Sequence, residues 1–153
     1  MDEMGINKPL YRLYGKSLRG IRVPDTITGK RSERTSVIAG YCNNTVIAPF
    51  IFTGYTNTDL IIFWIKEILI PELRSGQLVI FDNASYHKSS QVVELIESVG
   101  CKVLYLPPYS PDLNKIEKYW ANLKRKLREV WSEKMSIEDN INLGMNLSNF
   151  VMD

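Results

Sequence analysis

The stretch LPPYSPDLNKIEKYW, residues 106–120, marks the end of one structural element and the start of another. Its prolines Pro107, Pro108 and Pro111 fix φ and lack a backbone donor, so the stretch does not begin as a helix interior or a central strand. Apolar side chains then recur at the spacing of an amphipathic helix: Ile116, Tyr119, Trp120, Leu123 and Leu127. The stretch therefore predicts a rigid loop that leads into a helix. Glu117 lies in the first turn of that helix, off the apolar stripe.

Upstream of this loop, short apolar runs alternate with amphipathic segments. The strands predicted at 33–42 and 45–54 flank Asn43-Asn44, which suits a tight hairpin turn. The segments that follow are a helix to about Leu73, a strand at 77–82, a helix at 89–100 and a strand at 101–107. Strands that are connected through helices pair in parallel with right-handed crossovers. We therefore expect an α/β fold with a mixed sheet flanked by helices.

The composition is that of an ordinary globular domain. The chain has 153 residues, of which 44% are hydrophobic and 24% charged. The net charge of +2 does not by itself indicate a nucleic-acid-binding protein. Basic residues cluster, however, in two segments, Lys8–Arg34 and Lys115–Arg128. Each cluster is either a solvated face or a surface that contacts phosphates.

The cysteines and the apolar segments of the chain bear on its location in the cell. Cys42 and Cys101 lie far apart in apolar contexts and read as reduced core residues. We see no signal peptide, and the most apolar segment, 60–70, is too short to span a bilayer. These observations predict a cytoplasmic protein with no membrane association. The segment RLYGKSLRGIRV, residues 12–23, has the composition of a hairpin or basic flap, and a short helix is expected from Ser136.

Two carboxylates fall where the predicted topology brings them together. Asp82 ends the strand VIFD, and the carboxyl ends of parallel strands are where sites form in α/β sheets. The neighbouring strand feeds the loop that delivers Glu117. Each acid also has a structural explanation: Asp82 suits an Asx turn, and Glu117 suits the helix dipole. The pair at one edge of the sheet is more specific than either acid alone.

The motifs FDNASYHKS (81–89), LPPYSPDLNKIEKYWANLK (106–124) and DEMGIN with RLYGKSLRG resemble the catalytic domain of DDE transposases. They are most similar to the bacterial insertion-sequence branch of the mariner superfamily, which shows the same interval of 34 residues between Asp82 and Glu117. The resemblance runs from Asp2 to about Glu129. It implies an RNase H-like fold, with a catalytic domain at 1–131 and a C-terminal tail at 132–153.

The resemblance also assigns a catalytic and metal-binding triad, Asp2, Asp82 and Glu117. The family usually has proline where this chain has Lys115, which affects how the helix is started but not the identity of the acid. Two Mg²⁺ (or Mn²⁺) ions would serve the in-line displacements of DNA cutting and joining. Mg²⁺ takes oxygen ligands and keeps waters, so a few carboxylates and a substrate phosphate suffice.

Four further residues are expected near DNA. Lys124, Arg125 and Arg128 lie on the helix face opposite the apolar stripe, where they either contact phosphates or remain solvated. His87 contacts the scissile phosphate, supports a carboxylate or simply packs. The expected partner is double-stranded DNA, both as element ends and as target. The resemblance further implies a homodimer.

One expected element is missing. In the family, the first aspartate ends an apolar strand that is central in the sheet, whereas only Met1 precedes Asp2 here. We therefore expect the first central strand to be largely missing, with an exposed apolar slot in its place. This suggests a truncated or split transposase, with an upstream helix-turn-helix region as a separate subunit. The alternatives are an inactive remnant that at most binds DNA or a partner subunit, and another RNase H-like nuclease.

Overall fold

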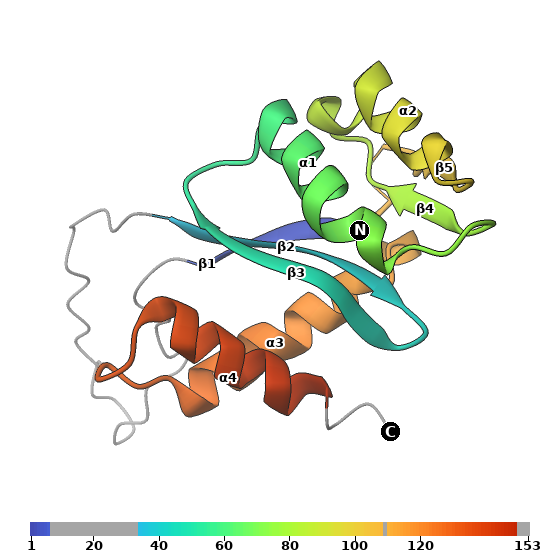
Figure 1. The fold of residues 1–153 in the computed structure, drawn as a ribbon. Helices are drawn as coiled ribbons and strands as arrows, with labels where there is room; N and C mark the ends of the chain where they lie inside the picture. The colour runs from blue at the N-terminus through green and yellow to red at the C-terminus, as the bar shows by residue number, and fades with distance from the viewer. Residues whose placement is uncertain (7–33, 109, 150–153) are drawn as a thin grey trace.

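A computed structural model describes residues 1–6, 34–108 and 110–149 (Figure 1). The predicted basic flap at 12–23 lies outside these residues, as does the first basic cluster apart from Arg34. Within the described residues, two groups of strands are flanked by helices on both sides.

The first sheet has three antiparallel strands in the order β1-β2-β3. Their bounds are Asp2–Ile6 for β1, Thr35–Cys42 for β2 and Thr45–Thr53 for β3. The predicted hairpin between β2 and β3 is confirmed: Asn43 and Asn44 form its turn with φ of 50° and 60°. Asparagine tolerates this left-handed backbone better than most residues, which explains the pair at this turn.

The second sheet consists of β4 (Leu78–Phe81) and β5 (Lys102–Tyr105), which pair in parallel. The crossover between them contains the 3₁₀ turn η3 (Ser85–His87) and α2 (Ser90–Ser98). Gly100, with a φ of 75°, closes the crossover after α2. Parallel pairing of these two strands was predicted from the sequence and is confirmed.

The start of the chain differs from the expectation in one respect. Asp2 was expected at the end of a strand that the chain largely lacks, but Asp2 begins β1 and pairs with Ala39 of β2. The five residues after Met1 therefore form the strand, because Met4 and Ile6 bury their side chains while Glu3 and Gly5 alternate with them. The sheet is still divided: in the described residues, no ladder joins β1-β2-β3 to β4-β5.

A groove lies between the two sheets and has a volume of about 440 Å³. We call it the β2–β4 groove. Its walls are the end of β2 and the start of β3 on one side and β4 on the other, and the residues that line both walls include Gly40, Tyr41, Cys42, Ile47, Leu78, Val79 and Ile80. At its end, the amine of Met1 donates a hydrogen bond of 2.6 Å to the carbonyl oxygen of Ile80. That this groove is the apolar slot expected from the sequence stays a prediction.

One hydrophobic core packs between the sheets and the helices that follow β3. The predicted helix after β3 is three segments: α1 (Thr58–Trp64), the π-helical η1 (Ile65–Leu69) and the 3₁₀ η2 (Ile70–Glu72). Asn57 caps α1 by accepting from the Leu60 amide. Together with α2, these segments bury a cluster that includes Ile38, Ala48, Ile61, Trp64, Ile65, Leu69, Val79, Phe81, Val92 and Ile96.

A second core lies on the opposite face of the three-stranded sheet, against α3 (Ile116–Val130) and α4 (Ile137–Asn149). The predicted apolar stripe of α3 is buried here, from Ile116 to Leu127. It meets Met4 and Ile6 of β1 and Val37 and Ala39 of β2. Figure 1 shows α3 and α4 on this side and α1 and α2 on the other. Because the three-stranded sheet separates the two cores, the two faces of β1 meet different neighbours.

None of the helices in the described part of the chain has the length and apolar character that crossing a bilayer requires.

Candidate active site

Three carboxylates from separate elements line one pocket of about 380 Å³. Asp2 comes from β1, Asp82 directly follows β4, and Glu117 lies in the first turn of α3. The loop between β5 and α3 completes the wall with Leu106, Pro107, Pro108, Ser110, Pro111 and Asn114. The fold therefore brings the three acids singled out by the sequence to the same pocket.

Asp82 is held by donors from its own loop. Its Oδ1 accepts a hydrogen bond of 3.0 Å from the Ala84 amide, which is the Asx turn that the sequence allowed. The same oxygen lies 2.6 Å from Nδ1 of His87. The hydrogen bond to His87 is the main cause that lowers the pKa of Asp82, although partial burial opposes it. Asp82 is thus ionised at neutral pH. It both stabilises the turn and lines the pocket.

Asp2 is the most buried of the three acids, with 8% of the residue exposed. Its Oδ1 accepts a hydrogen bond of 2.8 Å from the Glu3 amide. Burial is the largest cause that raises the pKa of Asp2 to about 7, and the negative charges of Glu117, Glu3 and Asp82 add to it. Asp2 therefore sits among like charges that favour its protonated form in the absence of a cation.

Glu117 is exposed at the start of α3, as its position off the apolar stripe predicted. The 3₁₀ turn η4 (Pro111–Leu113) precedes the helix, and the carbonyl oxygen of Asn114 accepts a 3.0 Å hydrogen bond from the Glu117 amide. Asn114 itself is buried, while its neighbour Lys115 makes no side-chain cap. The prolines of the loop and the buried stripe of α3 together direct Glu117 to the pocket.

Comparison with known proteins identifies the family. A family model described as DDE superfamily endonuclease matches residues 1–138. The chain belongs to this family. No curated protein matches the sequence at a significant level.

Solved structures of Mos1 complexes and of a viral intasome share the fold. The chain is similar to the Mos1 transposase in a strand transfer complex, with 17% identity, a TM-score of 0.69 and coverage of 99% of this chain and 46% of that one. A Mos1 mariner paired-end complex with Mn gives 17% identity, a TM-score of 0.52 and coverage of 97% and 51%. The intasome of simian T-cell lymphotropic virus, solved with a PP2A regulatory subunit, gives 14% identity and a TM-score of 0.52. The match covers 71% of this chain and 44% of that one. The likeness shows an RNase H-like fold, and this chain spans about half of those chains or less.

The pocket that Asp2, Asp82 and Glu117 line has the donor chemistry that a hard divalent cation prefers, since all three acids offer carboxylate oxygens. The raised pKa of Asp2 also fits, because a cation would offset the repulsion among these acids. The side chains do not form a closed cage: within 1–6, 34–108 and 110–149, no three Asp, Glu, His or Cys side chains are grouped to hold a metal ion. A cation here would complete its shell with water and substrate phosphate.

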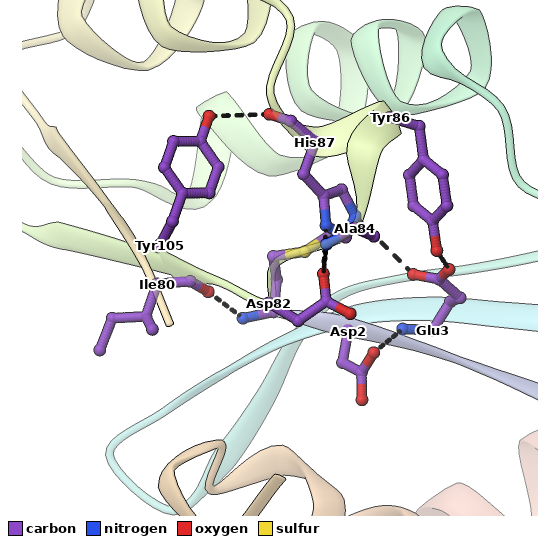
Figure 2. A network of polar contacts seen from close by, with 9 residues as sticks. Asp2, Glu3, Ile80, Asp82, Ala84, Tyr86, His87 and Tyr105 are labelled. Atoms are coloured by element: carbon purple, nitrogen blue, oxygen red, sulfur yellow. Dashed lines mark hydrogen bonds and ion pairs between the residues drawn. The ribbon is translucent and has the colours of Figure 1, made fainter. Parts of the chain in front are cut away.

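His87 is fully buried and contacts Asp82, so its position favours the role of supporting a carboxylate over direct contact with a phosphate. Figure 2 shows its imidazole between Asp82 and Glu3. Its Nε2 is 3.8 Å from Oε2 of Glu3, and the hydroxyl of Tyr86 donates to the other oxygen of Glu3. Sequence reasoning missed Glu3. The only signal was its position next to Asp2, on the other face of the strand.

The basic residues of α3 remain on the surface, but they differ in their surroundings. Arg125 donates to Glu129 at 2.9 Å and to Asn122 at 2.7 Å along the helix. Arg128 is exposed and Lys124 is partly exposed on the same helix as Glu117. The phosphate-contacting role of these residues stays a prediction.

Proposed function

We propose that this domain is the catalytic part of a transposase from the bacterial insertion-sequence branch of the mariner superfamily. It cuts DNA at the ends of an insertion element and joins the 3′-hydroxyl to target DNA. The observation that carries the proposal is that Asp2, Asp82 and Glu117 line one pocket in a chain of the DDE family. The Mos1 neighbours were solved as complexes named for strand transfer and paired ends, which supports the assignment.

The proposed reaction has two displacements at phosphorus. In the first, a water oxygen attacks a phosphodiester, the bond from phosphorus to the 3′ oxygen breaks, and a 3′-hydroxyl and a 5′-phosphate result. In the second, that 3′-hydroxyl attacks a target phosphodiester, and the target's own 3′ oxygen leaves. Two divalent cations, when bound, would activate the attacking oxygen and stabilise the leaving oxygen.

The chain's own residues have distinct roles in this scheme. Asp82, whose pKa is lowered, supplies a carboxylate that is ionised before any cation arrives. Asp2 supplies a buried carboxylate that becomes fully ionised when a cation offsets the neighbouring negative charges. Glu117 supplies the third carboxylate from the exposed first turn of α3, next to the face that carries Lys124 and Arg128. That face would hold the DNA by its phosphates.

Completion of the sheet is part of the proposal. The β2–β4 groove would accept an extended apolar strand between the end of β2 and β4, which line it. Such a strand would fix β1, and with it Asp2, relative to β4 and Asp82. The second candidate function is an inactive remnant that at most binds DNA or a partner subunit. A homodimer and a separate helix-turn-helix subunit are further proposals from the family resemblance.

The test is a nicking and joining assay with the purified chain. Supercoiled plasmid is incubated with Mg²⁺ or Mn²⁺, and an oligonucleotide with a free 3′-hydroxyl is supplied for joining. We expect metal-dependent nicks and covalent joining of the oligonucleotide. Asp82→Asn, which keeps the size of the side chain, should abolish both activities.

Glu94→Gln is the matched control, because Glu94 is an exposed acid on α2 and does not line the pocket. It should leave nicking and joining unchanged. Nicking that survives in Asp82→Asn would exclude the proposed catalysis and point to a contaminating nuclease. Activity confined to RNA–DNA hybrids would instead favour another RNase H-like nuclease.

A further inference from the structure

Glu3 and Asp2 are neighbours on β1, but their side chains lie on opposite faces of the strand. Asp2 lines the pocket with Glu117, whereas Glu3 reaches the 3₁₀ turn η3 on the other face. Successive side chains of a strand point to opposite faces, so this division follows from the backbone itself. Glu3 does not line the pocket, yet it touches the loop that carries Asp82.

His87 is the link between Glu3 and Asp82 (Figure 2). Its side chain is fully buried, with Nδ1 2.6 Å from Oδ1 of Asp82 and Nε2 3.8 Å from Oε2 of Glu3. The Ala84 amide donates to that same Oδ1 of Asp82 at 3.0 Å. Both contacts use one oxygen, which leaves Oδ2 of Asp82 for the pocket.

The facing atoms of Glu3 and His87 are both buried, and neither has a hydrogen-bond partner among the described residues. Buried polar atoms are nearly always paired, so two orphaned atoms that face each other point to an interaction. The two atoms lie 3.8 Å apart, which is an electrostatic contact rather than a hydrogen bond. This contact completes a chain from Glu3 through His87 to Asp82.

The surroundings restrain both ends of this chain. The hydroxyl of Tyr86 donates to Oε1 of Glu3, and the Tyr86 ring packs edge-on against His87 at 4.6 Å. The hydroxyl of Tyr105 donates to the backbone oxygen of His87 at 2.8 Å. The ring of Phe81 lies 5.1 Å from the imidazole. The imidazole therefore packs against side chains from β4 and η3, the hydroxyl of Tyr105 holds its backbone, and Glu3 lies on the side that faces β1.

We propose that Glu3 is a positioning residue that acts through His87 to hold Oδ1 of Asp82 and present Oδ2 to the metal site. The inference rests on the proposed function and adds a residue that the family triad does not contain. Its structural reason is the divided sheet. The Met1 amine bonds to the Ile80 carbonyl, but no ladder joins β1 to β4 in the described residues, so side-chain contacts add to what sets Asp82 relative to Asp2. Carboxylate–imidazole chains of this kind orient metal ligands, and their loss weakens metal binding.

The chain's single histidine makes the first test direct, because all imidazole signals in a nuclear magnetic resonance spectrum belong to His87. In the wild type, we expect an Nδ1–H resonance that is shifted downfield and exchanges slowly, since the group is buried and bonded to Asp82. Glu3→Ala should move or broaden this resonance. Asp82→Asn should change it as a positive control, and Glu94→Gln should leave it unchanged.

The second test measures Mn²⁺ binding by electron paramagnetic resonance on the same proteins. Glu3→Ala should raise the Mn²⁺ concentration at half-saturation by roughly 10-fold, the lower end for loss of a group that orients a metal ligand. Glu3→Gln should have a smaller effect, because its amide oxygen still accepts from Tyr86. Tyr86→Phe keeps the ring and removes only that bond, so it should also have an intermediate effect. The Glu94→Gln protein should bind as the wild type does.

These outcomes separate the inference from the proposed function. If Glu3→Gln, Glu3→Ala and Tyr86→Phe all leave the His87 resonance and the Mn²⁺ half-saturation unchanged, Glu3 has no positioning role. Should Glu3→Ala fail to fold, the Glu3→Gln and Tyr86→Phe proteins decide the same question. If the resonance responds to Glu3 but the wild type neither binds Mn²⁺ nor nicks DNA, the contact from Glu3 to Asp82 stands and the proposed catalysis fails.

Discussion

Asp2 and Glu117 line the same pocket, although 114 residues lie between them in the sequence. Asp2 begins β1, and Glu117 lies in the first turn of α3. Burial is the main cause that raises the pKa of Asp2 to about 7, and the charge of Glu117 adds to it. A buried acid whose charged form is disfavoured in this way destabilises the folded state when it is ionised. Ionised Asp2 is therefore unfavourable in the folded protein without a cation, and the free energy of unfolding should depend on pH and on cations.

The first prediction concerns pH. Because the pKa of Asp2 is higher in the folded state than its ordinary value of 3.8, the folded protein binds this proton more tightly between about pH 4 and pH 7. The free energy of unfolding should therefore fall as the pH rises through this window, by about 1.4 kcal/mol per unit of pKa difference at most. Denaturant unfolding at pH 5 and pH 7.5, with a chelator present, measures the fall.

Asp2→Asn isolates the contribution of this one acid. The variant should be more stable than the wild type at pH 7.5 without cations, and its stability should fall less between the two pH values. Mg²⁺ should stabilise the wild type more than the variant. An identical pH dependence in both proteins would contradict the assignment of the raised pKa to Asp2.

A second prediction addresses the basic face of α3. Replacing Lys124 and Arg128 together with glutamine should weaken binding to double-stranded DNA. The slope of log K against log salt should become less steep by about 0.9 for each lost phosphate contact. Fluorescence anisotropy over a salt series measures both quantities. Lys66→Gln is the control, since Lys66 is an exposed lysine of η1 that pairs with Glu67 at 3.5 Å.

Arg125 should contribute less than its neighbours do. Its guanidinium already donates to Glu129 and Asn122, so contact with a phosphate would require those bonds to break. Arg125→Gln alone should change the salt slope by less than Arg128→Gln does. Equal slopes for the two variants would show that the bonds of Arg125 to Glu129 and Asn122 do not compete with DNA.

The third prediction tests the β2–β4 groove. Five apolar, β-branched residues joined to Met1 should extend β1 along the groove, while five glycine and serine residues should not. The apolar extension also turns the buried amine of Met1 into an amide that keeps its bond to Ile80. A gain of about 1 kcal/mol would raise the Tm by several degrees. Hydrogen exchange of the β4 amides should slow only with the apolar extension, and equal effects of both extensions would exclude strand pairing.

A fourth prediction concerns the seam between α3 and α4. A β-carbon at Gly144 would lie 2.6 Å from Cδ2 of Leu127 and 3.2 Å from Cδ1 of Leu123, both in buried residues. Gly144→Ala should therefore destabilise the fold by about 1–3 kcal/mol through overpacking, despite the better helix propensity of alanine. Asn142→Ala, at an exposed position of α4, should be neutral or slightly stabilising. Thermal unfolding of both variants measures the difference.

Several parts of the fold could be predicted because local sequence determines them. The stripe from Ile116 to Leu127 predicted α3 and its buried face, and Asn43-Asn44 predicted the hairpin turn. The apolar run that ends at Asp82 predicted a strand buried on both faces, but Val79 and Phe81 are buried while Leu78 is exposed. The intervening helix predicted parallel pairing with β5, which is confirmed. The helix after β3 was predicted as one element, whereas its second half is π-helical and its end is 3₁₀. Pro71 lacks an amide and disturbs the helical ladder there, which spacing alone did not reveal.

The sequence by itself predicted most of the elements, the family and three acids as a candidate site, because periodicity, turn residues and motif spacing are local properties of the chain. Only the tertiary structure decided what surrounds those acids. That Asp2 begins a strand follows from the burial of Met4 and Ile6 against α3. That Glu3 faces His87 follows from the packing of β1 against η3. Contacts between residues so far apart depend on how separate elements meet, and no local pattern records that.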